Sequence, residues 1–146
     1  MKRALLIIGA LLVLVALLFL PLKPVHAQVA SITLDWTATG DDGNVGTAAS
    51  YDMRYGTTRP DTTSASAKAT WWAAATQVAG MPAPAISGTA QSKAVSPVGG
   101  FLTGRTYYFV LVATDDAGNV SAWSNVASKF LPDSIPPAPI IDLRVR

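Results

Sequence analysis

Two short polar loops carry the side chains best suited to chemistry, because each holds a pair of neighbouring aspartates. Asp41 and Asp42 lie in the sequence Gly-Asp-Asp-Gly-Asn, and Asp115 and Asp116 begin the sequence Asp-Asp-Ala-Gly-Asn. Carboxylate and carbonyl oxygens are the ligands that Ca²⁺ prefers. The same residue types also close tight turns by bonding their own backbone, which needs no metal. We predict no cofactor, and keep these four aspartates as the candidate Ca²⁺ ligands.

The residue inventory excludes most catalytic machinery. The sequence contains no cysteine and no glutamate, and its one histidine is His26. A Ser-His-Asp or Cys-His group needs a histidine beside the nucleophile, and a structural zinc site needs cysteine or histidine. What is left for acid–base chemistry is the pairs of carboxylates in exposed loops, with no sign of a cleft around them. We therefore predict that the protein is not an enzyme.

The first 27 residues have the pattern of a targeting segment. A basic start precedes an uninterrupted apolar run over residues 4–20, and the small residues Val25 and Ala27 follow. This order is typical of a secretory signal peptide that is cleaved after Ala27. The run also reaches the lower length limit for a membrane span, so an uncleaved membrane anchor is the alternative. In both cases we expect residues 28–146 outside the cytoplasmic membrane, whether secreted, extracellular or periplasmic.

Removal of this segment would change the charge balance. Lys2, Arg3 and Lys23 would leave with it, so eight Lys and Arg would face nine Asp, and the net charge would become −1 instead of +2. Nucleic-acid-binding domains usually carry a clustered positive patch. We therefore expect no nucleic-acid partner, and contact with a membrane only through the N-terminal segment.

The rest of the chain has the pattern of short antiparallel strands. Residues 31–38 and 50–56 alternate apolar and polar side chains, which is typical of half-buried strands. A weaker strand is expected over residues 89–96. Residues 106–114 form the most apolar segment, and turn-forming residues separate it from a last predicted strand over 121–130. Short strands divided by turns predict an antiparallel sandwich or barrel.

Four segments together resemble a fibronectin type III domain of the kind found in secreted bacterial proteins. Residues 34–37, Leu-Asp-Trp-Thr, resemble its second strand with the core tryptophan, and residues 51–55, Tyr-Asp-Met-Arg-Tyr, resemble its third. Residues 102–108 resemble the tyrosine corner that leads into strand F, and residues 118–124 resemble the approach to the last strand. The resemblance covers nearly all of the chain that follows the targeting segment. It implies an all-β, two-sheet Greek-key sandwich, immunoglobulin-like in kind.

The resemblance also implies which side chains form the core. Five residues are expected inside the sandwich: Trp36, Tyr51, Tyr55, Leu102 and Tyr108. The hydroxyl of Tyr108 is expected to bond the backbone of the turn that precedes its strand.

Five other aromatic residues are candidates for interaction. If Tyr108 points inward, Tyr107 and Phe109 point outward and leave an apolar stripe on the sheet. The segment with Trp71 and Trp72, expected as a short helical turn or bent strand, is a candidate cover for that stripe, because tryptophan is rarely left fully in water. The alternative is that Trp71 or Trp123 forms a stacking platform for sugar rings.

The resemblance divides the chain into three parts. Residues 1–27 are the targeting segment, residues 28–131 the domain, and residues 132–146 a proline-rich tail that resembles the start of a following domain. The domain has no room for the first strand of the family, so an edge of its second strand is expected to lack a partner. The apolar residues 140–145 could stay free, pair with this edge in another copy, or return to their own domain.

Taken together, these features predict a non-catalytic, secreted or surface-exposed module for structure or interaction. Its role would be adhesion, spacing or binding to the cell envelope, and its partner a protein or a polysaccharide at the cell surface. One alternative is a carbohydrate-binding accessory module or a fragment of a larger extracellular enzyme. Another is a subunit that assembles by strand donation through residues 140–145.

Overall fold

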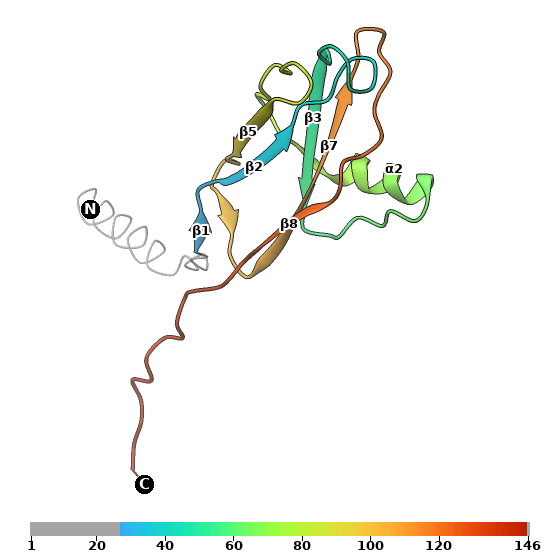
Figure 1. The fold of residues 1–146 in the computed structure, drawn as a ribbon. Coiled ribbons are helices and arrows are strands. Elements are labelled where there is room, and N and C mark those ends of the chain that lie inside the picture. The colour runs from blue at the N-terminus through green and yellow to red at the C-terminus, as the bar shows by residue number, and fades with distance from the viewer. Residues whose placement is uncertain (1–26, 146) are drawn as a thin grey trace, which may run out of the picture.

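The computed structural model describes residues 27–145, which fold as antiparallel β-structure with one short helix (Figure 1). Most of the predicted targeting segment, residues 1–26, lies outside the described residues. The elements in chain order are β1 (Gln28–Val29), β2 (Ile32–Thr37), β3 (Ser50–Gly56), α2 (Ala65–Ala74), β4 (Thr76–Gln77), β5 (Ala90–Val95), β6 (Phe101–Leu102), β7 (Arg105–Thr114) and β8 (Ala127–Leu131). Within residues 27–145, no helix is long and apolar enough to cross a membrane.

The strands form three antiparallel groups. The largest is a four-stranded sheet in the order β4-β3-β7-β8, while β2 pairs with β5 and β1 pairs with β6. β3 and β7 run side by side from the pair Ser50 and Thr114 to the pair Gly56 and Tyr108. The sheets enclose an apolar core made of two buried clusters, which share the partly buried Trp36, Met81 and Leu111, and this is consistent with an all-β sandwich. The strands predicted over 31–38, 50–56 and 106–114 are confirmed as β2, β3 and β7.

The last predicted strand is shorter than the sequence pattern indicated. β8 begins at Ala127, and the predicted portion before it is irregular. There the hydroxyls of Ser121 and Ser124 accept hydrogen bonds from the backbone N–H groups of Ala113 and Leu111, each at 3.0 Å. Serine side chains thus stand in for part of the regular backbone ladder along β7, which explains why this segment keeps close to β7 without being a strand.

The prediction that Tyr108 points into the core is wrong, because the alternation along β7 has the opposite phase. Tyr107 and Phe109 are buried in the core, and Tyr108 lies on the other face, partly exposed. The hydroxyl of Tyr107 accepts a hydrogen bond from the N–H of Leu102 at 3.0 Å and donates one to the C=O of Leu102 at 3.2 Å. Gly104, with a φ of +74°, lies between β6 and β7, where the tight connection needs a left-handed backbone that glycine adopts without strain.

The other predicted core residues are placed as follows. Tyr51 is buried, whereas Trp36, Tyr55 and Leu102 are only partly buried. Tyr55 still packs on the core, with its ring centroid 5.4 Å from that of Phe101. Trp36 meets Tyr51 edge to face at 5.5 Å, and its indole N–H is buried without a hydrogen-bond partner among the described residues. The core prediction is therefore confirmed for Tyr51 and only in part for the other three.

Helix α2 begins earlier than the helical turn predicted near Trp71. The side-chain oxygen of Ser64 accepts a hydrogen bond from the N–H of Ala67 at 3.1 Å and caps the helix at its first turn. The helix then runs through alanine, serine, lysine and threonine to two tryptophans. Its only buried residue is Trp71, so one large side chain holds the helix against the sheet.

Candidate functional site

Helix α2 covers the face of the four-stranded sheet that points away from the core (Figure 1). The Nε1 of Trp71 donates a hydrogen bond to the C=O of Thr58 at 2.8 Å. Its ring packs over Gly56 at the end of β3, where an added Cβ would lie 3.7 Å from the ring. The predicted intramolecular cover is confirmed. The prediction that Tyr107 and Phe109 form the covered stripe is wrong, because both point into the core.

The buried residues on the covered face of β7 are valines and not the predicted Tyr107 and Phe109. Val110 and Val112 of β7 are 1% and 6% exposed, although they alternate with residues that face the core. Both faces of β7 are therefore buried, one by the sandwich core and one by α2 and the segment that follows β7. Tyr107 and Phe109 are consequently unavailable to a partner. The tryptophans are the predicted interaction residues that remain.

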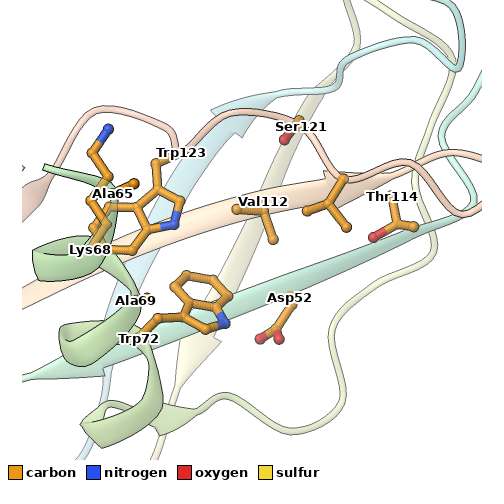
Figure 2. Close-up of a pocket in the computed structure, with 10 residues that line it drawn as sticks. Asp52, Ala65, Lys68, Ala69, Trp72, Val112, Thr114, Ser121 and Trp123 are labelled. Atoms are coloured by element: carbon orange, nitrogen blue, oxygen red, sulfur yellow. The ribbon is translucent and has the colours of Figure 1, made fainter.

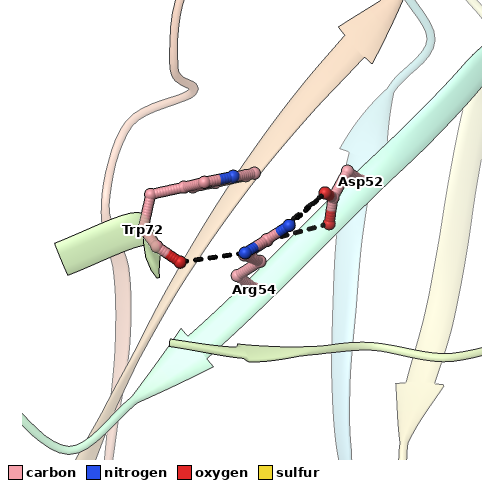
Figure 3. Close-up of polar contacts among 3 residues, drawn as sticks. All are labelled: Asp52, Arg54 and Trp72. Atoms are coloured by element: carbon pink, nitrogen blue, oxygen red, sulfur yellow. Dashed lines mark hydrogen bonds and ion pairs between the residues drawn. The ribbon is translucent and has the colours of Figure 1, made fainter. Parts of the chain in front are cut away.

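Arg54 of β3 fixes the position of Trp72 (Figure 3). Its guanidinium forms an ion pair with Asp52 at 3.0 Å and donates to the C=O of Trp72 at 3.0 Å. The guanidinium carbon also lies 4.7 Å from the centroid of the Trp72 ring, in cation–π geometry. Trp72 is thus held at its backbone and on one face of its ring, and this orientation is set before any ligand arrives.

A groove of about 440 Å³ opens between α2 and the chain segment after β7 (Figure 2). Lys68 and Trp72 line it from the helix, and Trp123 lines it from the opposite wall. Val112 and Thr114 of β7 also line it, and Figure 2 shows both residues on the strand beneath the two walls. This volume lies in the range of small-molecule sites, which are typically mostly apolar with a few placed polar groups.

Two tryptophans form the aromatic part of the groove lining. The rings of Trp72 and Trp123 have centroids 5.5 Å apart and planes tilted by 36°, and both residues are half-buried. The Nζ of Lys68 lies 5.8 Å from the centroid of Trp123. Asp52 and Ser121 add a carboxylate and a hydroxyl. The groove thus combines aromatic surface with groups that can donate and accept hydrogen bonds.

Trp71 plays a different part from the one proposed for it as a sugar platform. It is 8% exposed, and its ring stacks edge-on against Trp123 with centroids 5.6 Å apart. It therefore supports Trp123 from beneath, while Trp72 faces the groove. The sequence analysis missed Arg54, Lys68 and Asp52 at this site. The alternating polar residues of 50–56 could have indicated this, because charged side chains on a strand face that becomes covered need hydrogen-bond or ion-pair partners.

The two aspartate loops meet at one pole of the sandwich. The Oδ1 of Asp41 accepts a hydrogen bond from the backbone N–H of Asp116 at 3.1 Å, which joins the loops. Asp115 bonds within its own turn to Asn119, and the backbone of Asp42 pairs with that of Val45. In the part of the chain that the structure describes, no three His, Cys, Asp or Glu residues gather in a metal-binding arrangement.

Acidification is expected to loosen the loop closed by Asp115. Two hydrogen bonds from Asn119 hold the pKa of Asp115 below its usual value. The larger effect comes from the Asn119 side chain, and the smaller from its backbone N–H at 2.7 Å. A lowered pKa in the folded state stabilises the fold above the pKa of the unfolded chain, about 4, and this contribution is lost as the pH falls through the folded-state pKa. An NMR titration of the Asn119 amide should show a midpoint below that of an aspartate in a free peptide. A midpoint at the free-peptide value would contradict this expectation, and the Asp115→Asn variant should show no such titration.

Comparisons of the chain with protein-family models, with curated proteins and with solved structures gave no match. The groove and its tryptophans are therefore the features from which we infer a function.

Proposed function

We propose that the protein is a non-catalytic interaction module of the fibronectin type III kind, displayed outside the cytoplasmic membrane, with the α2 groove as its binding site. The observation that carries the proposal is the pair formed by Trp72 and Trp123, which line a groove of ligand size instead of packing into the core. Tryptophan costs free energy when left half-exposed, and it is enriched where one side must meet a partner.

The ligand class that suits the groove best is a saccharide. Sugar rings present apolar C–H faces that pack on aromatic rings, and their hydroxyls both donate and accept hydrogen bonds. The groove is lined by the rings of Trp72 and Trp123, together with the ammonium of Lys68 and the hydroxyls of Thr114 and Ser121. In this role the module would attach to cell-envelope polysaccharide and serve adhesion or anchoring.

Preorganisation supports binding in this groove. The ion pair of Arg54 with Asp52 and the stacking of Arg54 on Trp72 hold the aromatic wall in place. A site whose side chains are already ordered loses less conformational entropy when the ligand binds. Trp123 is ordered in the same way by its contacts with Trp71 and Lys68.

The test is retention of the full chain on an array of soluble and insoluble polysaccharides. We expect at least one polysaccharide to bind, and the Trp72→Ala and Trp123→Ala variants to lose at least tenfold in affinity. Phe130→Ala is the matched control, because Phe130 is an exposed aromatic residue (59%) on β8 that does not line the groove. Absence of retention on every polysaccharide would contradict the saccharide proposal, as would an equal loss for Phe130→Ala.

A further inference from the structure

One edge of β2 has no strand beside it within residues 27–145. β2 pairs with β5 along its whole length, from Ile32 with Val95 to Thr37 with Ala90, and β1 pairs with β6 instead. Just beyond β2, the N–H and C=O of Ala38 bond toward the β5 side. Because bonding direction alternates along a strand, the backbone groups of Asp35 and its neighbours two residues away face the open edge. Such an edge is a template for another strand.

The open edge gives access to the apolar core. A small cavity of about 90 Å³ lies there, lined by Leu34 and Trp36 of β2 and by Leu111 and Ser124 from the region of β7 and the segment after it. The three apolar side chains pack against the core but stay partly exposed. Trp36 is also the residue whose buried indole N–H lacks a partner among the described residues. An apolar strand laid along this edge would therefore complete the core.

The C-terminal tail has the pattern of such a strand. Ile141, Leu143 and Val145 are 92%, 90% and 101% exposed, and they alternate with Asp142 and Arg144. In an extended strand, the three apolar side chains would lie on one face and the two charged ones on the other. The tail thus has the pattern of an amphipathic strand, and its apolar side chains are exposed.

We propose that the tail of one copy of this chain pairs with the open edge of β2 in a second copy, as an added antiparallel strand. The register that places Arg144 opposite Asp35 joins opposite charges on the outer face. The same register places Leu143 opposite Trp36 and Val145 opposite Leu34, on the face that looks into the core. Directly opposite residues share a face in an antiparallel pair, so charge and apolar patterns agree on one register.

A second copy fits the geometry better than the chain's own tail. β8 ends at Leu131, beside the start of β7, and the tail runs away from the domain there (Figure 1). To pair antiparallel with its own β2, the tail would first have to return along the molecule. As an extended proline-rich chain, the nine steps from Leu131 to Ile140 span about 28 Å, whereas β2 alone covers about 20 Å before any detour around the surface. A neighbour stacked beyond this end requires no reversal. This inference is independent of the groove beside α2.

Directed disulfide formation between two differently labelled chains tests the pairing. The native sequence has no cysteine, so Asp35→Cys in one full-length chain and Arg144→Cys in another supply the only thiols. Paired as proposed, the two positions would lie about 5.5 Å apart between Cα atoms, within disulfide range. Both positions are exposed, so neither change should disturb folding. In detergent solution under mild oxidation, we expect the mixed dimer to form at least tenfold faster than with a Thr62→Cys partner, which places the thiol in an exposed loop.

A second substitution distinguishes a disulfide that forms through strand pairing from one that forms when two chains collide at random. Leu143→Asp, added to the Arg144→Cys chain, puts a charge on the face that must enter the core and should reduce the rate to that of the Thr62→Cys control. An equal rate with the control partner overturns the proposal. A fast rate that survives Leu143→Asp overturns it as well.

Discussion

The Phe109→Ala variant is expected to lose about 3–5 kcal/mol of the free energy of unfolding, which is the usual loss for truncating a buried phenylalanine. Phe109 is 2% exposed and packs against the rings of Tyr55 and Phe101, with centroids 5.8 Å and 6.2 Å away. Its removal leaves a cavity in the core, where the rings around it belong to β3 and β6. Urea unfolding of the full chain, followed by circular dichroism, should show a lower midpoint with an unchanged slope.

Tyr108→Ala is the matched control, because it removes the neighbouring ring from the other face of the same strand. Tyr108 is partly exposed and belongs to neither buried cluster, so its loss should be clearly smaller than that of Phe109. A larger loss for Tyr108→Ala would mean that β7 has the phase indicated by the sequence resemblance and not the one described above.

The second large effect is expected for Trp71→Ala, also at about 3–5 kcal/mol. Trp71 is the one buried residue of α2, and it holds the helix through the Thr58 carbonyl and the ring of Trp123. Without it, α2 loses its one buried side chain and its contacts with Gly56, Thr58 and Trp123. Far-UV circular dichroism should show loss of the helical signal together with a lower unfolding midpoint.

The adjacent tryptophan provides the comparison. Trp72→Ala removes a half-buried ring that lines the groove, so it should change ligand binding far more than stability. Equal destabilisation by Trp71→Ala and Trp72→Ala would contradict the division between an anchoring and a binding tryptophan.

The sequence was sufficient to predict a strand and its two faces where apolar and polar residues alternate. β2 and β3 alternate cleanly between apolar and polar residues, so their positions and their faces follow from the pattern. Both faces of β7 are buried. In its run from Tyr107 to Val112, the odd-numbered and the even-numbered residues are equally apolar. A shift of one residue exchanges the faces, and nothing in such a run decides between them.

Helix α2 was harder to predict because its residues do not form an apolar stripe. Its sequence is rich in alanine, serine and threonine, and it buries a single side chain. The groove exists only when that helix is formed, because the helix buries Trp71 and leaves Trp72 to line the groove. The polar face of β3 indicates that Arg54 needs a partner, but its contact with Trp72 beside the groove forms only when α2 docks.

The distribution of the four tryptophans gives the molecule two separate optical reporters. Trp71, Trp72 and Trp123 form one cluster with neighbouring ring centroids 5.5–5.6 Å apart, so they should exchange excitation energy and respond together when the groove fills. Trp36 stands apart, beside the open edge of β2. Its emission should shift to shorter wavelength when a strand covers that edge and removes water from its ring. Fluorescence of a Trp36→Phe variant would then follow the groove alone, without any attached dye.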